Sequence, residues 1–577
     1  MFIVKDLFVK YKNDFYCVLG LLLVFLVCTI VSWGTFGALY YDCGREVLLP
    51  QWILEGKIIF KDVFAMYLPL PYYINALFYK IFGQSITILQ ILGCINTFII
   101  IAVLYGIMRV FTDRYYSFSM CIFIILFYIF RSFTCMNYIF PYAYAMIYSL
   151  SAMLFSVLCG LLFVKTSKTF FIPLAYLMLG LSVANKPEFI FCIIPLVIIT
   201  VLSHKNTFRL WLLNIAAFVM PSVLSWGVLF LQGFGTEDFR NYYNFLDKFF
   251  KTEEQRYYTL HFVKLPFSIN NILAVCKAFL VSAVTITYSV LSLRLLTVKR
   301  LRFIGIILTA GLFVLLLHLN NILTVSVYQP LSWVYVTSFI IAVISLKNKD
   351  KKLGFISLCA VLSCARTDFI TVQQVGYSMY LILLPVITTW IYIVQRYGNI
   401  ICEKFKIKYQ IILSLIIIAV SVFTFNTILK NVQYMAVNTN NKGVLKASKE
   451  LVIPFNKTVE WILTNTNDTD RVVVLPEGPM INFITQRPTL PKYYHLIPNH
   501  ISALGEDNVV KGLSEDMPEY FVINNTEYST YNKPHICEDF GFDICRFIEN
   551  NYTLQVVYRA YSPKGKPHTS KIYKLGK

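Results

Sequence analysis

The sequence predicts a mainly α-helical, polytopic membrane protein that ends in an α/β domain. Its 577 residues are 57% hydrophobic and only 14% charged, with a mean hydropathy of +0.63. Soluble domains carry about 25% charged residues, so most of this chain is expected to lie in lipid. Apolar runs of about 17–25 residues, long enough to cross a bilayer, recur up to about residue 428. The more polar remainder is long enough for a folded domain.

Thirteen apolar segments are predicted to span the membrane. Two of them have a second interpretation, since 169–203 could be one broken hairpin and 353–365 is short for a full crossing. The segments lie near residues 15–37, 86–108, 115–130, 143–164, 169–184, 188–203, 208–231, 269–292, 303–318, 322–346, 353–365, 376–395 and 410–428.

The first segment is open to two interpretations, a cleaved signal peptide or a retained span. Its apolar run is longer than a usual signal-peptide core, and Ser32–Phe36 shows no small-residue cleavage pattern. We interpret it as retained. Thirteen spans with a cytoplasmic N-terminus then put the C-terminal tail on the outer face of a plasma membrane or bacterial inner membrane.

The net charge of +20 is unevenly placed along the chain. With the N-terminus inside, the cytoplasmic segments hold 21 Lys and Arg against 5 Asp and Glu, whereas the outer loops between spans hold 12 against 11. An excess of Lys and Arg in short cytoplasmic loops sets the orientation of membrane proteins. The excess of Lys and Arg over Asp and Glu therefore predicts the orientation of the chain in the membrane, and it implies no nucleic-acid partner.

The predicted spans divide the chain into three parts. Residues 1–231 form a first membrane module with a large outer loop at 38–85, residues 232–428 begin with a second outer loop, and residues 429–577 form the soluble tail.

The tail is predicted to fold as a small layered α/β domain, because apolar β-rich runs alternate with helical patterns in it. Lys446 to about Thr466 has helical spacing. No Gly-rich phosphate fingerprint follows the first strand, which leaves nucleotide binding unsupported. The predicted strands are 471–475, 520–523, 554–558 and 571–574, with further helices after Pro479 and near Phe547.

Cys537 and Cys545 differ from the other cysteines, most of which fall inside spans. Both belong to the predicted outer domain, where a disulfide could persist. A disulfide and two unpaired thiols are both consistent with the sequence.

The first outer loop is rich in charged and aromatic residues. Asp42 and Glu46 directly follow the first span, and a helical chain there would place both carboxylates on one face. Arg45, Lys57 and Lys61 offer charge-assisted donors that suit a phosphate. The alternative interpretation is that Asp42 and Glu46 are two solvated loop acids.

At this point the chain resembles the membrane-embedded GT-C glycosyltransferases. These include the lipid A aminoarabinose transferase, protein O-mannosyltransferases and lipopolysaccharide-core transferases. The resemblance covers the first seven predicted spans and rests on an Asp-x-Gly-x-Glu type motif at 42–46, Gly-Lys-Ile-Ile-Phe-Lys-Asp at 56–62 and Leu-Pro-Leu-Pro-Tyr-Tyr at 68–73. It implies an enzyme that moves a hexosyl or pentosyl unit from a polyprenyl-phosphate donor to a lipid, glycan or protein acceptor.

The resemblance also implies roles for the candidate residues. Asp42 would accept the acceptor's proton with Glu46 beside it, while Lys and Arg groups stabilise the leaving phosphate. No cofactor is expected, although a divalent cation bridging Asp42 to the phosphate is compatible with the pattern. The donor-phosphate candidates are Arg45, Lys57, Lys61, Arg131, Lys186 and Arg366, and the substrate-loop candidates are Asp62, Tyr67, Pro71 and Tyr72.

Some of these residues have a simpler interpretation. Lys186 could belong to a polar turn between two apolar runs, and Arg131 and Arg366 could be interfacial anchors at span ends. The second outer loop could be a mobile lid or a solvated amphipathic helix.

A transporter or flippase of a lipid-linked saccharide is the competing function. Ion-coupled transporters usually keep ionisable groups in mid-membrane. In this chain the acids gather on outer loops, and Lys277 is the conspicuous charge inside a span. The distribution favours chemistry at the membrane surface. A polysaccharide polymerase or ligase is closer in chemistry and stays open.

Overall fold

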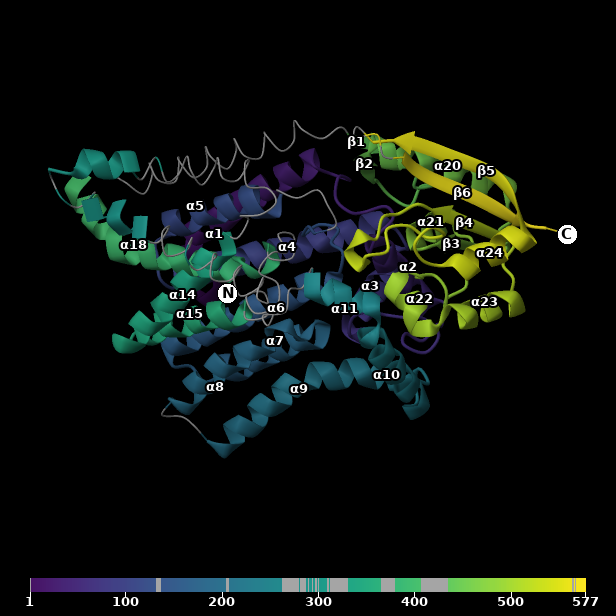
Figure 1. Ribbon diagram of the computed structural model, residues 1–577. Helices are drawn as coiled ribbons and strands as arrows, with labels where there is room; N and C mark the ends of the chain where they lie inside the picture. Colours follow the sequence, from purple (N-terminus) through teal and green to yellow (C-terminus); the bar gives the residue numbers. More distant parts are fainter. Residues whose placement is uncertain are drawn as a thin grey trace.

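The computed structural model shows a bundle of long helices that ends against a C-terminal sheet domain (Figure 1). It describes residues 2–130, 136–203, 207–261, 330–364, 379–405 and 434–562, together with 565, 567–576 and part of the stretch from 280 to 311. The predicted segments 269–292, 303–318, 322–346 and 410–428 lie wholly or partly outside the described residues, as does Lys277.

The helices of the bundle follow the apolar segments predicted from the sequence. They are α1 (Phe2–Val31), α4 (Ile86–Arg109), α5 (Arg114–Ile124) continued by the π-helix η1 (Ile125–Ile129), α6 (Tyr144–Thr166), α7 (Phe171–Asn185), the 3₁₀-helix η2 (Pro187–Cys192) continued by α8 (Ile193–Val201), α9 (Phe208–Leu231), α14 (Pro330–Lys347), α15 (Lys351–Ser363) and α18 (Leu383–Phe405).

Four helices in the described part of the chain are long and apolar enough to cross a membrane, judged by length and composition. They are Lys12–Val31, Ile86–Arg109, Tyr144–Thr166 and Phe208–Leu231. The structure therefore supports a helical integral membrane protein but not the predicted count of thirteen spans. Part of the difference arises because apolar segments such as 171–185 form helices that are too short for a full crossing.

The two loops predicted to be outer, which keep the names first and second outer loop below, both contain helices. The first loop forms α2 (Cys43–Leu54) and α3 (Pro69–Phe82), and the second forms α10 (Thr236–Lys251) and α11 (Glu253–His261). Proline is favoured in the first turn of a helix, where its missing N–H has no partner to lose, and Pro69 stands at the start of α3.

The C-terminal domain contains a four-stranded mixed sheet in the order β3-β4-β6-β5. The strands β3 and β4 are parallel, with Val472 opposite Tyr520, and the other pairs are antiparallel. The elements of the domain are β1 (Tyr434–Ala436), β2 (Lys446–Ser448), α20 (Lys449–Asn465), β3 (Val472–Leu475), α21 (Pro479–Thr485), α22 (Pro498–Leu504), α23 (Glu506–Glu515), β4 (Tyr520–Asn524), η3 (Ser529–Tyr531), α24 (Phe542–Asn551), β5 (Tyr552–Tyr561) and β6 (Pro567–Leu575).

The domain packs directly on the first outer loop, with α21 against α2. Gly44 lies at this junction: a Cβ at this position would lie 2.6 Å from the backbone nitrogen of Met480 and 2.9 Å from Cγ of Pro479. Only glycine allows so close an approach of two backbones. The apolar core is continuous across the junction, since buried Val47 and Met480 belong to the same cluster.

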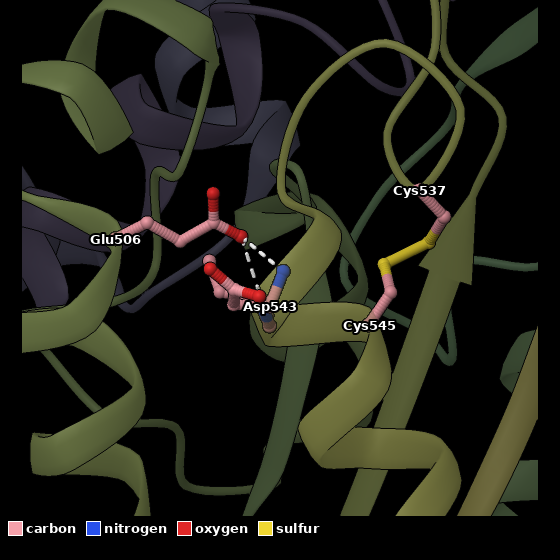
Figure 2. The surroundings of a disulfide bond; sticks show 5 residues. Glu506, Cys537, Asp543 and Cys545 are labelled. Atoms are coloured by element: carbon pink, nitrogen blue, oxygen red, sulfur yellow. Dashed lines mark hydrogen bonds between the residues drawn. A yellow bond between two sulfur atoms is a disulfide. The ribbon is translucent and has the colours of Figure 1, made fainter.

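A disulfide joins Cys537 and Cys545 in the C-terminal domain (Figure 2). It ties the loop before α24 to the first turns of that helix. Glu506 supports the same helix end, because its Oε1 accepts hydrogen bonds from the backbone N–H groups of Asp543 at 2.6 Å and Ile544 at 3.1 Å. Of the two states left open by the sequence, the structure has the disulfide.

Candidate active site

A cluster of charged side chains lies buried where the first outer loop meets the C-terminal domain. Arg45 is at its centre, and its guanidinium contacts residues of both parts. Nη2 pairs with Oδ1 of Asp42. Nη1 lies 2.6 Å from Nε2 of His495 and 4.0 Å from Oε2 of Glu477. Because an unpaired buried charge is costly, these contacts are what allow Arg45 to be only 5% exposed.

Asp42 is the accessible carboxylate of the cluster. It occupies the N-cap position of α2 with a φ of +34°, a backbone region in which non-glycine residues are uncommon and must be held by their surroundings. Its side chain is 31% exposed, so a substrate can reach it. Partial burial raises the pKa of Asp42, and the neighbouring Arg45 opposes that shift.

Glu46 is enclosed instead, at 2% exposure. Its Oε2 accepts a hydrogen bond from the backbone N–H of Tyr144 at 3.0 Å, at the first residue of α6. A helix N-terminus favours a charged carboxylate, but burial has the larger effect and raises the pKa of Glu46 to about 8. The predicted shared face depended on one helix that includes both acids, and Asp42 instead precedes α2, which begins at Cys43.

Glu477 enters the cluster from the loop between β3 and α21. It is 3% exposed, and its Oε1 accepts a hydrogen bond from the hydroxyl of Tyr528 at 3.0 Å. Its Oε2 lies 3.3 Å from Nε2 of His495 but has no hydrogen-bond partner among the described residues. Burial raises the pKa of Glu477. This oxygen is a polar atom at the centre of the site that a substrate hydroxyl could contact.

The contact with Arg45 determines which ring nitrogen carries the proton in His495 and, through His495, in His500. An arginine can only donate, so Nε2 of His495 accepts, and Nδ1 carries the proton of the neutral ring. Burial and the charge of Arg45 lower the pKa of His495 well below its ordinary value, which keeps the ring neutral. Nδ1 of His500 lies 3.5 Å from Nδ1 of His495. His500 therefore carries its proton on Nε2, a buried atom with no hydrogen-bond partner in the described structure.

Lys186 forms a second buried group beside this cluster. It lies at the break between α7 and η2, and its Nζ is 3.0 Å from Oε1 of Glu188 and 2.9 Å from the hydroxyl of Tyr142. The ring of Tyr67 lies 5.1 Å from the same Nζ. Burial raises the pKa of Tyr67 to about 12, and the charges of Lys186 and Arg45 both oppose that shift. Tyr67 is thus influenced by the charges of both cationic groups.

The structure places Lys57 and Lys61 away from the cluster. Lys57 is exposed and lines a cavity between α2 and α21. Lys61 pairs with Asp238 of α10 at 3.3 Å and donates to the carbonyl oxygen of Gly233 at 3.1 Å. Lys61 therefore connects the two outer loops.

The other substrate-loop candidates have structural contacts. Asp62 accepts a hydrogen bond from the backbone N–H of Ile58 at 2.7 Å and closes a turn. Tyr72 is buried, and its hydroxyl accepts from the backbone N–H of Tyr67 at 3.3 Å. Pro71 is buried in the first turn of α3. Arg131 and Arg366 lie outside the described residues.

A cavity of about 290 Å³ opens beside the two histidines. The first outer loop, α10 and the C-terminal domain each contribute to its walls. These walls include Phe64, Tyr242, Phe245, Lys492, His495 and His500. The ring of Phe64 meets that of His500 edge-on at 4.4 Å. The cavity is small, mostly aromatic and partly polar, which is typical of a site for a small polar ligand.

Reasoning from the sequence missed Glu477, His495, His500 and Tyr528. One signal could have found the first, because Glu477 follows the first strand of the tail, and ligands of α/β domains gather at the carboxyl ends of strands. His495 and Tyr528 come from loops and His500 from the short helix α22, and none of the three belongs to a motif.

The described residues contain no group of three or more His, Cys, Asp or Glu side chains placed to hold a metal ion. The acids and the histidine of the cluster instead converge on the guanidinium of Arg45, which supplies the positive charge at this position.

No protein-family model matches the sequence, and a comparison with curated proteins finds no similar sequence. Solved structures do match. ArnT from Cupriavidus metallidurans, bound to undecaprenyl phosphate, is similar with a TM-score of 0.53 and 10% identity over 96% of this chain and 97% of its own. The oligosaccharyltransferase of Archaeoglobus fulgidus, in the apo form, has a TM-score of 0.50 and 11% identity over 98% of this chain and 75% of its own.

These similarities show that the chain has the fold of the GT-C membrane glycosyltransferases. The resemblance stated from the first outer loop is therefore confirmed for the fold.

Proposed function

We propose that this protein is a membrane glycosyltransferase that moves a sugar from a polyprenyl-phosphate donor to an acceptor hydroxyl at the outer face of the membrane. The observation that carries this proposal is the accessible Asp42 beside a buried arginine. Its carboxylate is 31% exposed, whereas Glu46 and Glu477 are 2% and 3% exposed. The site therefore offers one reachable base within a shell of fixed charges.

In the proposed reaction Asp42 takes the proton of the acceptor hydroxyl. The acceptor oxygen forms a bond to the anomeric carbon of the sugar, and the bond from that carbon to the phosphate oxygen breaks. The bonding electrons leave with the polyprenyl phosphate. The raised pKa of Asp42 makes it a better base than a solvated aspartate.

Two cations are in position to stabilise the leaving phosphate. Arg45 and Lys186 are both buried, and contacts to developing charge are strongest where water is excluded. The ArnT structure with undecaprenyl phosphate supports this class of donor, because ArnT shares the fold. In this proposal the phosphate lies between the two cations, near Tyr67.

The acceptor is proposed to approach through the cavity beside His495 and His500. Two buried polar atoms near that route have no hydrogen-bond partner in the described structure. They are Oε2 of Glu477 and Nε2 of His500. Such atoms stabilise a ligand that completes their hydrogen bonds. A hydroxyl-bearing lipid, glycan or protein segment would fit this requirement.

The topology belongs to the same proposal. A cytoplasmic N-terminus and an outer C-terminal domain follow from the distribution of Lys and Arg, and they place the charge cluster at the outer leaflet. Reporter fusions after Tyr434 test this directly. A cytoplasmic signal from that fusion would contradict the proposed site.

The function is tested with the purified full-length protein in nanodiscs, radiolabelled polyprenyl-phosphate sugars and a membrane extract as acceptor source. We expect label to move from the donor into a new product, with free polyprenyl phosphate released. In proteoliposomes, transbilayer movement of intact labelled donor without transfer would favour the transporter or flippase instead.

A further inference from the structure

A second cavity, of about 470 Å³, lies at the opposite end of the helical bundle. The last turn of α6, the end of α8 and the turn between α14 and α15 enclose it. The first residue of α6, Tyr144, contacts Glu46 of the candidate site, and Phe163 near its other end lines this cavity. A helix rises about 1.5 Å per residue, so the two sites are about 30 Å apart, which is the thickness of the bilayer core.

The walls of this cavity are apolar and open toward lipid. Several lining side chains are strongly exposed in the bundle, including Leu202 and Leu346 at 61% each. An exposed apolar surface on membrane helices is covered by acyl chains rather than by water. The apolar lining residues include Phe163, Val164, Ile198, Leu202, Leu346 and Phe355.

The rim of the same cavity is basic. Lys349 and Lys351 line it and are exposed, and no ion pair links either of them to another described residue. Asp350, which lies between them and also lines the cavity, caps α15, because its Oδ1 accepts hydrogen bonds from the backbone N–H groups of Lys352 at 3.1 Å and Leu353 at 3.0 Å. Two lysines against one aspartate leave this rim with net positive charge for a ligand.

We propose that this cavity binds an anionic phospholipid of the leaflet at this end of the bundle. One acyl chain would occupy the apolar interior, and the phosphate would lie on Lys349 and Lys351. The proposal rests on the match between an apolar cavity at the level of the lipid tails and two cations at the level of the head groups. The site is separate from the proposed donor site, since a bilayer thickness lies between them.

Native mass spectrometry of the delipidated full-length protein tests the proposal, with phosphatidylglycerol and phosphatidylcholine as probes. We expect phosphatidylglycerol to bind more tightly than phosphatidylcholine. Each lysine near an anionic head group is expected to contribute about fivefold in affinity. The double variant Lys349→Gln/Lys351→Gln should lose most of this preference. Arg209→Gln, an exposed cation outside this cavity, should keep it.

A second pair of variants tests the cavity itself. Gly354 lines it, and a Cβ there would meet only Cβ of Ser345 at 3.7 Å, an ordinary contact, so Gly354→Leu can begin a side chain at the cavity wall. A Cβ added at Gly227 of α9 would have no atom within 4 Å, which makes Gly227→Leu the matched control. We expect phosphatidylglycerol binding to fall only in Gly354→Leu, with both variants monodisperse.

Three results would overturn the proposal. The first is equal binding of the two phospholipids, and the second is unchanged phosphatidylglycerol binding in both the double lysine variant and Gly354→Leu. The third is stronger binding of undecaprenyl phosphate than of phosphatidylglycerol in a way that depends on Lys349 and Lys351, which would assign the cavity to a polyprenyl lipid.

Discussion

The two halves of the candidate site are encoded differently. In the first outer loop, Asp42, Arg45 and Glu46 lie within about one helical turn, and their spacing alone predicts a site. In the C-terminal domain, Glu477 and His495 come from separate loops and meet Arg45 only in the folded protein. A compact charged motif is therefore visible in a sequence, whereas partners that converge through folding leave no local pattern.

The largest effect is expected in the first outer loop. Asp42→Asn keeps the shape of the side chain but removes its charge and basicity, so turnover should fall by about 10²–10⁴ with donor binding largely retained. Steady-state transfer rates and donor binding of the folded variant measure this. Near-normal turnover would remove Asp42 as the base and would favour the transporter.

The next effect tests whether the C-terminal domain takes part in the reaction. Glu477→Gln keeps the acceptor for Tyr528 but removes the negative charge beside Arg45 and His495. A guanidinium displaced by about 1 Å can cost up to about 10² in rate. We expect a loss of this order in turnover. Glu506→Gln, in the same domain at the end of α24, is the control and should leave turnover unchanged. A loss confined to stability in Glu477→Gln would mean that the domain is only a scaffold.

A smaller effect, on the KM for the donor, distinguishes the buried Lys186 from the exposed Lys57. Lys186→Met should raise the KM for the donor by about tenfold, because a charge-assisted hydrogen bond to the phosphate would be lost. Lys57→Ala should leave the KM unchanged, since Lys57 lies outside the charge cluster. The opposite result in this pair of KM measurements would restore the role that the sequence suggested for Lys57.

The last effect concerns pH and stability and leaves the rate of transfer aside. Burial raises the pKa of Glu46 from an ordinary value of 4.5 to about 8. Between these pH values the folded protein holds one proton more than the unfolded chain. The contribution of Glu46 to the free energy of unfolding is therefore complete below pH 4.5 and is lost as the pH rises to about 8. The free energy of unfolding changes with pH by at most about 1.4 kcal/mol per pH unit through this group.

Glu46→Gln removes this titration while it keeps the acceptor for Tyr144. Thermal unfolding of the variant should therefore depend less on pH than that of the wild type over the same range. Identical profiles for the two proteins would show that Glu46 is already ionised in the folded state.

The sequence predicted more of the fold than of the site. The strands at 472–475 and 520–524 match the predicted segments, because short apolar runs bounded by turn residues are local signals. The role of Gly44 was not predictable, since it depends on the backbone of Met480 from a distant part of the chain. The sequence did not show that Asp42 would precede the helix that holds Glu46.

A double-mutant cycle on the rate of sugar transfer tests most directly whether the loop and the C-terminal domain form one site. The rates needed are those of the wild type, Asp42→Asn, Glu477→Gln and the double variant, all in folded full-length protein. If Glu477 acts by holding Arg45 against Asp42, the double variant should be about as slow as Asp42→Asn alone. Losses that simply multiply would show that the two residues act independently and would contradict a shared site.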